Sequence, residues 1–342
     1  MILVTGGSGF IGSVLVRTLF ERGEQVRVFD IIDFKDRASG IEFVRGDIRR
    51  QEDIVCALDG VGTVYHNAAL VPLAKAGQFF WDVNVTGTAL LLDQCRKHNI
   101  KRFVHVSSSA VFGIPQCPIT DKSPLRPVEI YGKAKLAGEN LVKKYIADGY
   151  TATIIRPRTV LGNFRLGVFH ILFEWISENK NIYIIGKGNN LFQFVHVDDL
   201  VDAMIKSARW GKSGIFNIGT DRFATLREDL ASFIKEVGSI SRVRSLPETL
   251  AISTLSVLDW LRLSPLAPWH YLTYCKPFYF DVSYEKEVLK WEPRYSNIEA
   301  FVVAYRWYIE NKDRLNEEVG QDTSTHHTPP KQRILKLLKW LS

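Results

Sequence analysis

The 342-residue sequence has no cysteine pattern typical of disulfide bonds or of bound zinc. Its four cysteines are scattered without paired spacing, whereas disulfide frameworks and structural zinc sites need closely spaced pairs. The absence excludes a disulfide-stabilised fold and fits a protein of the reducing cytoplasm. We expect no metal site.

Long apolar runs are also missing. No stretch of 18 or more apolar residues occurs, and a membrane-spanning helix needs about that length. Met1–Thr5 runs directly into glycines, so we expect a first strand there and no cleavable targeting segment.

More than half of the net positive charge lies at the C-terminal end of the sequence. The net charge is +7, and four cations fall within residues 331–342, which contain no acid. The rest of the chain therefore carries only +3 (7 − 4). Such a small excess does not indicate a nucleic-acid partner.

Short β-branched runs alternate with helical stretches over residues 1–160. This alternation predicts an α/β fold with a doubly wound parallel sheet. The predicted strands are Ile2–Val4, Val26–Phe29, Ile41–Val44, Val61–His66, Phe103–Val106 and Thr153–Arg156. Ile11–Arg22 and Thr86–His98 are predicted helices.

After Gly162 the pattern loosens. Leu191–Val197 and Ile215–Ile218 are expected to return to the sheet as strands. Residues 247–280, rich in Leu, Trp, Tyr and Pro, suit a pocket wall. The further predicted helices are 164–179, 226–237 and Ile298–Asn311.

A glycine motif follows the first strand. Gly6, Gly9 and Gly12 stand three apart, with Phe10 and Ile11 opening a helix. Glycines at this spacing allow a tight turn, close approach of a pyrophosphate, and close helix packing, and the helix N-terminus offers N–H groups to phosphates. The motif predicts a Rossmann-type dinucleotide site.

Asp30 ends the second strand and indicates which dinucleotide binds. A carboxylate there accepts hydrogen bonds from ribose hydroxyls and repels a 2′-phosphate. We therefore predict NAD as the cofactor.

A second pattern indicates chemistry. Tyr131 and Lys135 stand four apart and share one helix face. A phenol is a poor base at neutral pH, but a nearby ammonium favours the phenolate. Ser107–Gly113 follows a strand at the edge where α/β sheets bind ligands.

With these motifs the chain resembles the extended short-chain dehydrogenase/reductase family, its NAD-dependent epimerase/dehydratase group, over roughly residues 1–312. The segments that carry the resemblance are Thr5–Gly12, Gly46-Asp47, Asn67–Ala69, Asn84–Thr88, Ser107–Gly113, Tyr131–Lys135, Arg156-Pro157 and His196–Asp199. The resemblance implies an oxidoreductase or isomerase that transfers a hydride at a secondary alcohol carbon.

Residue by residue, the resemblance implies three catalytic groups: Ser108, Tyr131 and Lys135. It implies that Tyr131 and Lys135 also contact the cofactor, together with the residues of the glycine motif and Asp30. The further implied cofactor contacts are Asp47, Ile48, Asn67, Ala68, Ala69 and Pro157. The predicted substrate contacts are Ser108, Ser109, Thr159 and Gln193. It also implies that His196, Asp198 and Asp199 are structural.

Two substrate classes stay open. Nucleotide-sugar epimerases of the family carry an asparagine where this chain has Thr159 and an arginine where it has Leu191–Phe194; Arg156, Arg158, Arg165 and Lys187 are possible substitutes. Features near Gly186–Asn190 resemble 3β-hydroxysteroid and sterol dehydrogenases. We rank the nucleotide sugar first and a non-catalytic NAD-sensing scaffold a distant third.

The predicted domains are a Rossmann domain (1–162 with 191–220), a smaller C-terminal substrate-binding lobe (163–190 with 221–316), a polar linker (317–330) and a basic amphipathic helix (331–342). Ile334, Leu337, Leu338 and Leu341 form one apolar stripe of that last helix. We expect it to contact either the inner face of an anionic membrane, as a peripheral segment, or protein. Helices near 86–98 and 131–148 are expected to pair in a homodimer.

Overall fold

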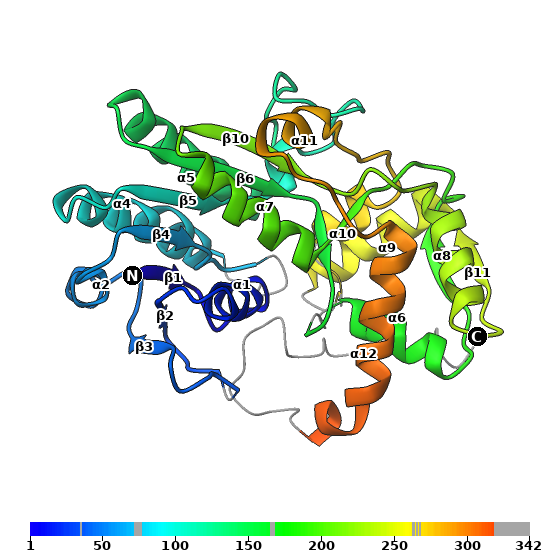
Figure 1. Ribbon diagram of the computed structural model, residues 1–342. Coiled ribbons are helices and arrows are strands. Elements are labelled where there is room, and N and C mark those ends of the chain that lie inside the picture. Colours follow the sequence, from blue (N-terminus) through cyan, green and yellow to red (C-terminus); the bar gives the residue numbers. More distant parts are fainter. Residues whose placement is uncertain are drawn as a thin grey trace.

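A seven-stranded parallel β-sheet forms the centre of the molecule in this computed structural model (Figure 1). Strand order reverses between β1 and β4, which is where doubly wound sheets bind ligands. In spatial order the strands are β10 (Gly214–Ile218), β6 (Ala152–Pro157), β5 (Arg102–Val106), β4 (Thr63–His66), β1 (Ile2–Thr5), β2 (Val26–Asp30) and β3 (Glu42–Arg45).

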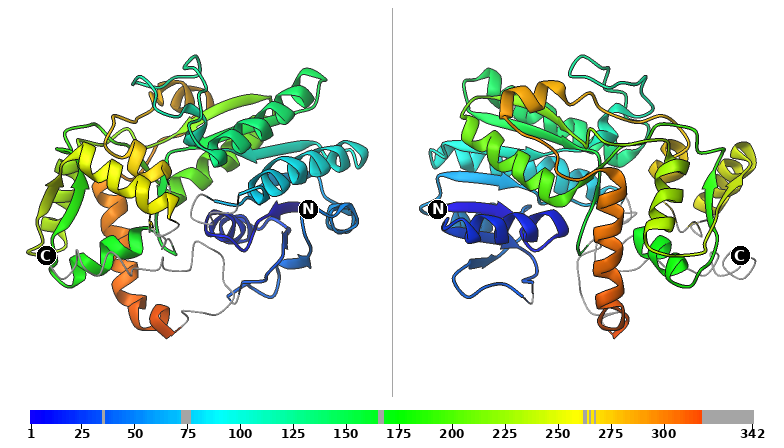
Figure 2. Two further views of the ribbon diagram at one scale, coloured as in Figure 1. Left: turned by 180° about the vertical axis from the view of Figure 1, so that it is seen from behind. Right: turned by 45° about the vertical axis from the view of Figure 1, so that its right-hand side comes forward.

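Helices cover both faces of this sheet (Figures 1 and 2). One face carries α2 (Gln51–Leu58), α4 (Thr88–Lys97) and α5 (Ile130–Ala147), which pack side by side. The other carries α1 (Phe10–Glu21) and α7 (Val197–Trp210). The predicted Rossmann-type doubly wound fold is confirmed.

Two small parallel sheets lie outside the central one. β7 (Thr159–Leu161) pairs with β9 (Phe194–His196), and β8 (Ile182–Ile185) pairs with β11 (Val243–Leu246). The expectation that Leu191–Val197 returns to the central sheet is therefore wrong. The place beside β6 is taken by β10, and Phe194 is instead buried in the C-terminal lobe.

The C-terminal lobe is built from helices around an aromatic core. They are α6 (Val168–Ser177), α8 (Leu226–Glu236), α9 (Glu248–Trp260), α10 (Pro268–Thr273) and α12 (Asn297–Glu317). Within that core Phe233 stacks on Phe301, and Phe173 contacts Phe233 edge to face.

One helix within the range predicted for the lobe packs against the central sheet. α11 (Ser283–Leu289) packs against α7 and β10. The Glu285 carboxylate of α11 accepts a hydrogen bond from the backbone of Asn217 in β10 at 2.8 Å, and burial raises its pKa to about 7.

The structure describes residues 1–34, 36–71, 77–164, 168–261, 264, 266 and 268–317. Among these residues no helix combines the length and hydrophobicity needed to span a bilayer. Most of the predicted linker (317–330) and the whole predicted helix 331–342 lie outside the described residues.

Candidate active site

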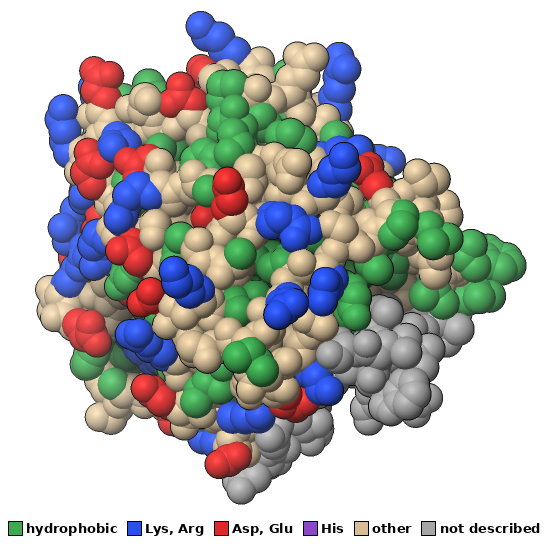
Figure 3. All heavy atoms as spheres, turned by 90° about the vertical axis from the view of Figure 1, so that its right-hand side faces the viewer, with side chains coloured by type: hydrophobic (Ala, Val, Ile, Leu, Met, Phe, Trp, Pro, Cys, Tyr) green, Lys and Arg blue, Asp and Glu red, His purple; other side chains and the backbone are tan. Residues whose placement is uncertain are grey.

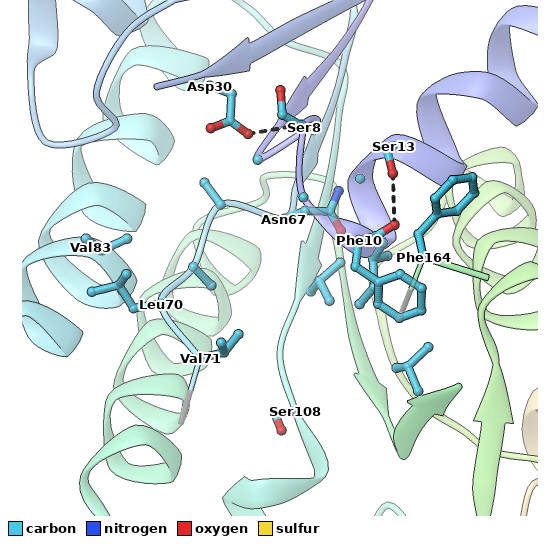
Figure 4. Close-up of a pocket in the computed structure, with 18 of the residues that line it drawn as sticks. Ser8, Phe10, Ser13, Asp30, Asn67, Leu70, Val71, Val83, Ser108 and Phe164 are labelled. Carbon is cyan, nitrogen blue, oxygen red and sulfur yellow. Dashed lines mark hydrogen bonds between the residues drawn. The ribbon is translucent and has the colours of Figure 1, made fainter. Parts of the chain in front are cut away.

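One large cavity of about 860 Å³ lies at the carboxyl edge of the central sheet. It extends from the glycine turn after β1 to α10 and the end of α12 in the C-terminal lobe. Figure 4 shows Asp30, Asn67 and Ser108 along its length. All the predicted cofactor residues line it, as do Ser108, Ser109 and Thr159.

The glycine turn has no room for side chains. Gly6 adopts a φ of +66°, and a Cβ there would lie 2.6 Å from the backbone nitrogen of Ala68. A Cβ on Gly12 would lie 2.1 Å from the carbonyl oxygen of Gly6. These contacts explain why the turn needs glycine and leave its backbone open to a phosphate group.

Asp30 is fixed at the end of β2, above this turn. Its carboxylate accepts a hydrogen bond of 3.0 Å from the backbone nitrogen of Ser8 (Figure 4). It accepts another, of 2.8 Å, from the backbone nitrogen of Ile31. Burial raises its pKa, and backbone hydrogen bonds from Ser8, Ile31 and Ile32 oppose that shift. The bond to Ser8 ties the carboxylate to the glycine turn, so the two halves of the predicted adenosine site are held together.

Asn67 offers an unused amide to the cavity. Neither its side-chain oxygen nor its side-chain nitrogen has a hydrogen-bond partner among the described residues, although both atoms are buried. Buried polar groups are normally satisfied, so this amide fits a contact with a bound molecule. Asp47 lies nearby with Arg49 bound to its carboxylate, which lowers its pKa.

Ser108 follows β5 and begins a short 3₁₀ turn, Ser109–Phe112. Its Oγ accepts a hydrogen bond of 3.1 Å from the backbone nitrogen of Ala110. This bond uses one of the two lone pairs of the oxygen and leaves the hydroxyl hydrogen able to donate to a substrate oxygen.

Tyr131 lies in the first turn of α5. The Glu129 side chain caps this helix by accepting hydrogen bonds of 2.7 Å from the backbone nitrogens of Tyr131 and Gly132. The Tyr131 ring contacts Phe80 edge to face, with 6.0 Å between centroids. Cap and ring contact together fix the direction in which the phenol enters the cavity.

Lys135 lies one helical turn after Tyr131 and is buried. Its Nζ donates a hydrogen bond of 2.8 Å to the carbonyl of Val106, the last residue of β5. Burial lowers the pKa of Lys135 to about 8, and the negative charge of Glu139 opposes that shift. The lysine therefore stays mainly protonated at pH 7, beside the phenol.

A buried ion pair lies beneath these groups. Glu139 accepts hydrogen bonds from Arg156 Nε at 2.8 Å and from Ser107 Oγ at 2.7 Å. Burial raises the pKa of Glu139, but the bonds and charge of Arg156 outweigh burial and lower it overall. A fixed carboxylate one helical turn beyond Lys135 stabilises the protonated form of the lysine.

The model of the NAD-dependent epimerase/dehydratase family matches residues 2–219. The chain belongs to this family. The segment matched spans the glycine turn, Asp30, Ser108, Tyr131 and Lys135, so family and geometry identify the same cavity. The chain is therefore an oxidoreductase or epimerase, and its cofactor is NAD.

Relatives with assigned activities include a sugar epimerase and a sterol dehydrogenase. The putative UDP-glucose 4-epimerase of Methanocaldococcus jannaschii is 33% identical over 70% of this chain and 83% of its own. The decarboxylating sterol-4-alpha-carboxylate 3-dehydrogenase of Mus musculus is 32% identical over 60% of this chain and 58% of its own. The solved structure of MoeE5 in complex with UDP-glucuronic acid and NAD is 26% identical, covers 91% of this chain and 99% of its own, and has a TM-score of 0.74.

The residues present fit NAD. The glycine turn is closed to side chains, the Asn67 amide is unsatisfied, and Asp30 is fixed where the family binds ribose. Asp30, Asn67 and Lys135 would contact the dinucleotide, which supplies a hydride acceptor or donor when bound.

Gln193, a predicted substrate contact, is not brought to the cavity. Its Nε2 donates to the carbonyl of Thr220 at 2.6 Å, and its Oε1 accepts from the backbone nitrogen of Phe280 at 2.9 Å. Its amide is thus bound to backbone on both sides and buried, so we assign it a structural role.

The His196–Asp199 segment, which the resemblance implies to be structural, forms hydrogen bonds with groups of the protein itself. His196 accepts a hydrogen bond from the backbone of Asp198 at the start of α7. Asp199 accepts hydrogen bonds from Arg294 and Tyr295. Among the described residues no group of three or more His, Cys, Asp or Glu side chains could hold a metal ion.

Of the four basic residues proposed to replace the missing arginine, the structure brings one to the cavity. Arg158 lines it. Arg156 is bound to Glu139, Lys187 is exposed and does not line the cavity, and Arg165 lies outside the described residues. Sequence reasoning did not single out Glu129 or Glu139, although Glu139 follows Lys135 by one helical turn.

Proposed function

We propose that the enzyme transfers a hydride at a secondary alcohol carbon of a nucleotide-activated sugar. The observation that carries this proposal is that Ser108, Tyr131 and Lys135 line the same continuous cavity as the glycine turn and Asp30. The similarity to the Methanocaldococcus protein and to MoeE5, which binds UDP-glucuronic acid, supports the sugar class.

The chemistry assigned to these residues is a proton transfer coupled to the hydride step. Tyr131 takes the proton from the substrate hydroxyl during oxidation and returns it during reduction. Ser108 donates a hydrogen bond to the same oxygen and so orients it. The ammonium of Lys135, fixed by Val106, stabilises the phenolate form of Tyr131.

A second candidate is a sterol-type dehydrogenase acting on an apolar alcohol. It is favoured by the aromatic side chains at the far end of the cavity. These are Trp269 of α10 and Tyr274, which follows α10 in the chain. It is also favoured by the similarity to the Mus musculus sterol dehydrogenase. Both candidates use the same three catalytic residues.

The test is to follow NADH absorbance and product composition with a panel of UDP-sugars and a panel of 3-hydroxysterols. Turnover of a UDP-sugar at least tenfold faster than any sterol is expected. Turnover of sterols alone would replace the first proposal by the second. Inactivity of Tyr131→Phe on the active substrate links the turnover to this cavity.

We also propose that α4 and α5 pair with their copies in a homodimer. The two helices lie side by side on one face of the sheet, and Leu90, Leu136 and Leu141 on them are only partly buried. Pairing would complete a four-helix bundle and cover these side chains. A monomer in sedimentation velocity at micromolar concentration would contradict this.

Contact with an anionic membrane is proposed for the C-terminal segment 331–342. Within the described residues, α9 exposes Leu250, Val257 and Trp260. Figure 3 shows hydrophobic side chains gathered on the lobe's side of the molecule. An exposed apolar surface in the lobe would add to the affinity of a basic amphipathic helix for lipid.

A further inference from the structure

Arg158 is a buried cation without a carboxylate partner. It lies between β6 and β7, lines the cavity, and is only 1% exposed. Within the described part of the chain its guanidinium forms no ion pair with an acidic side chain, and it donates hydrogen bonds to Gln193 and Ser109. By contrast, Arg156, two residues earlier, is paired with Glu139.

The contacts that Arg158 does make hold it in a defined position. Nε donates to the carbonyl of Gln193 at 3.1 Å, and Nη1 donates to the Oγ of Ser109 at 3.1 Å. Nη2 has no partner among the described residues. The guanidinium carbon lies 3.9 Å from the ring centroid of Phe278 and 4.8 Å from that of Phe192, so aromatic rings surround part of the group.

An ionised group held this way is costly. Buried charges in proteins are normally paired, because desolvation is otherwise uncompensated. Burial lowers the pKa of Arg158 to about 9, which still leaves it charged at neutral pH. The positive charge is therefore present when substrate binds, and no carboxylate among the described residues balances it.

We propose that Arg158 binds a carboxylate of the substrate and makes the enzyme selective for an acidic substrate. The location of that carboxylate follows from Ser109, which binds Arg158 and is the neighbour of Ser108. Both serines line the cavity, so the carboxylate lies close to the reacting carbon. A single guanidinium with one unsatisfied nitrogen matches one negative charge, whereas a diphosphate carries at least two.

This proposal rests on the proposed function for the position of the reacting carbon. The first test compares UDP-glucuronic acid with UDP-glucose, which share the diphosphate and differ in a carboxylate against a hydroxymethyl group. Wild-type kcat/KM is expected to be at least tenfold higher for the acid. In Arg158→Met the ratio of kcat/KM for the acid to that for UDP-glucose falls by about 10- to 100-fold, as for a lost charge-assisted hydrogen bond.

Arg102→Met is the matched control. Like Arg158, Arg102 donates to a backbone carbonyl, that of Ala208 at 2.7 Å, but it is only partly buried and does not line the cavity. It should leave both kcat/KM values and their ratio unchanged. Arg158→Lys, which keeps the charge, should recover part of the preference for the acid.

Thermal unfolding gives a readout that does not depend on turnover. In the presence of NAD, UDP-glucuronic acid should raise the unfolding midpoint of the wild type more than UDP-glucose does, and this difference should vanish in Arg158→Met. If instead Arg158→Met lowers the midpoint of the ligand-free protein well below that of Arg102→Met and reduces both activities equally, Arg158 is structural and the proposal is overturned.

A second pair of probes separates this proposal from the proposed function. If neither UDP-sugar is bound or turned over, the same measurements are made with a 3-hydroxysteroid carboxylic acid and its methyl ester, which differ in charge. An Arg158-dependent preference for the acid there supports the carboxylate site and removes the nucleotide sugar. Lack of preference for the acid in both pairs overturns the carboxylate site.

Discussion

Lys135 Nζ lies 2.8 Å from the carbonyl oxygen of Val106, and this bond joins α5 to the end of β5. Ser107 and Ser108 follow Val106 directly. The bond therefore fixes the positions of Lys135, Tyr131 and Ser108 relative to one another. Movement of α5 relative to β5 would disturb all three groups together.

Tyr131→Phe is expected to lower kcat by at least about 100-fold, the lower range for loss of a general acid–base group, while the Kd for NAD changes less than threefold. The reason is that the phenol moves the proton, whereas the glycine turn and Asp30 hold the cofactor. Calorimetry with NAD and steady-state assays with the active substrate check both parts. Tyr145→Phe, a change on the same helix outside the cavity, should leave kcat unchanged; turnover of Tyr131→Phe within tenfold of wild type removes Tyr131 from the chemistry.

The lowered pKa of Lys135 predicts how stability depends on pH. In the cofactor-free protein the folded-state pKa is about 8, against 10.5 for the ordinary side chain. Between these values the unfolded chain holds the proton and the folded chain has lost it, so the free energy of unfolding rises with pH through this window. Full passage through it is worth about 3 kcal/mol at about 1.36 kcal/mol per pKa unit.

Lys135→Met removes this contribution. Urea unfolding of wild type and variant between pH 7.5 and 10.5 should show stability rising more steeply in the wild type. Lys133→Met, at an exposed position of the same helix, should follow the wild-type slope. Parallel curves for wild type and Lys135→Met would show that the lysine does not titrate in this window.

Local sequence patterns were sufficient to predict the Rossmann half of the fold and to select three candidate catalytic residues that line one cavity. The glycine spacing, the acid after β2 and the Tyr131–Lys135 pair each depend on residues close together in the chain. A turn that has no room for a Cβ atom, as at Gly12, requires glycine, so the glycine spacing alone predicts it.

Sequence reasoning failed where a side chain's environment comes from distant segments. Gln193 is held by Thr220 and Phe280, and no local pattern announces those partners. From sequence Arg158 was one of four candidate cations. Its contacts with Phe278 and Ser109, which are distant in the chain, distinguish it from the other three. The sequence predicted a strand at β9 but not its partner. β10 pairs with β6 at the edge of the central sheet, and β9 pairs with β7 instead.

Preference for NAD over NADP is expected to depend on the charge of Asp30. The carboxylate repels a 2′-phosphate, so NAD should bind at least tenfold more tightly. Asp30→Asn keeps an oxygen that can accept the hydrogen bond from Ser8 and removes the charge, so the ratio of the two Kd values should narrow by about tenfold. Glu42→Gln, which removes a charge outside the cavity, should leave the ratio unchanged, and equal wild-type affinities would refute the assignment.

The last prediction concerns residues 331–342, which lie outside the described residues. An isolated 12-residue helix is marginal in water, so its apolar stripe needs a surface to fold against. An anionic bilayer offers burial and attracts each Lys or Arg near its surface by roughly 1 kcal/mol. The full-length protein should therefore co-sediment with phosphatidylserine-containing vesicles at low salt, less so at high salt, and a chain truncated after residue 330 should stay in the supernatant. Replacing the four cations by Gln separates charge from apolar burial, since it should reproduce the high-salt result. If the full-length protein stays in the supernatant at low salt, the segment docks on protein instead, and truncation should then lower the unfolding midpoint or dissociate the dimer.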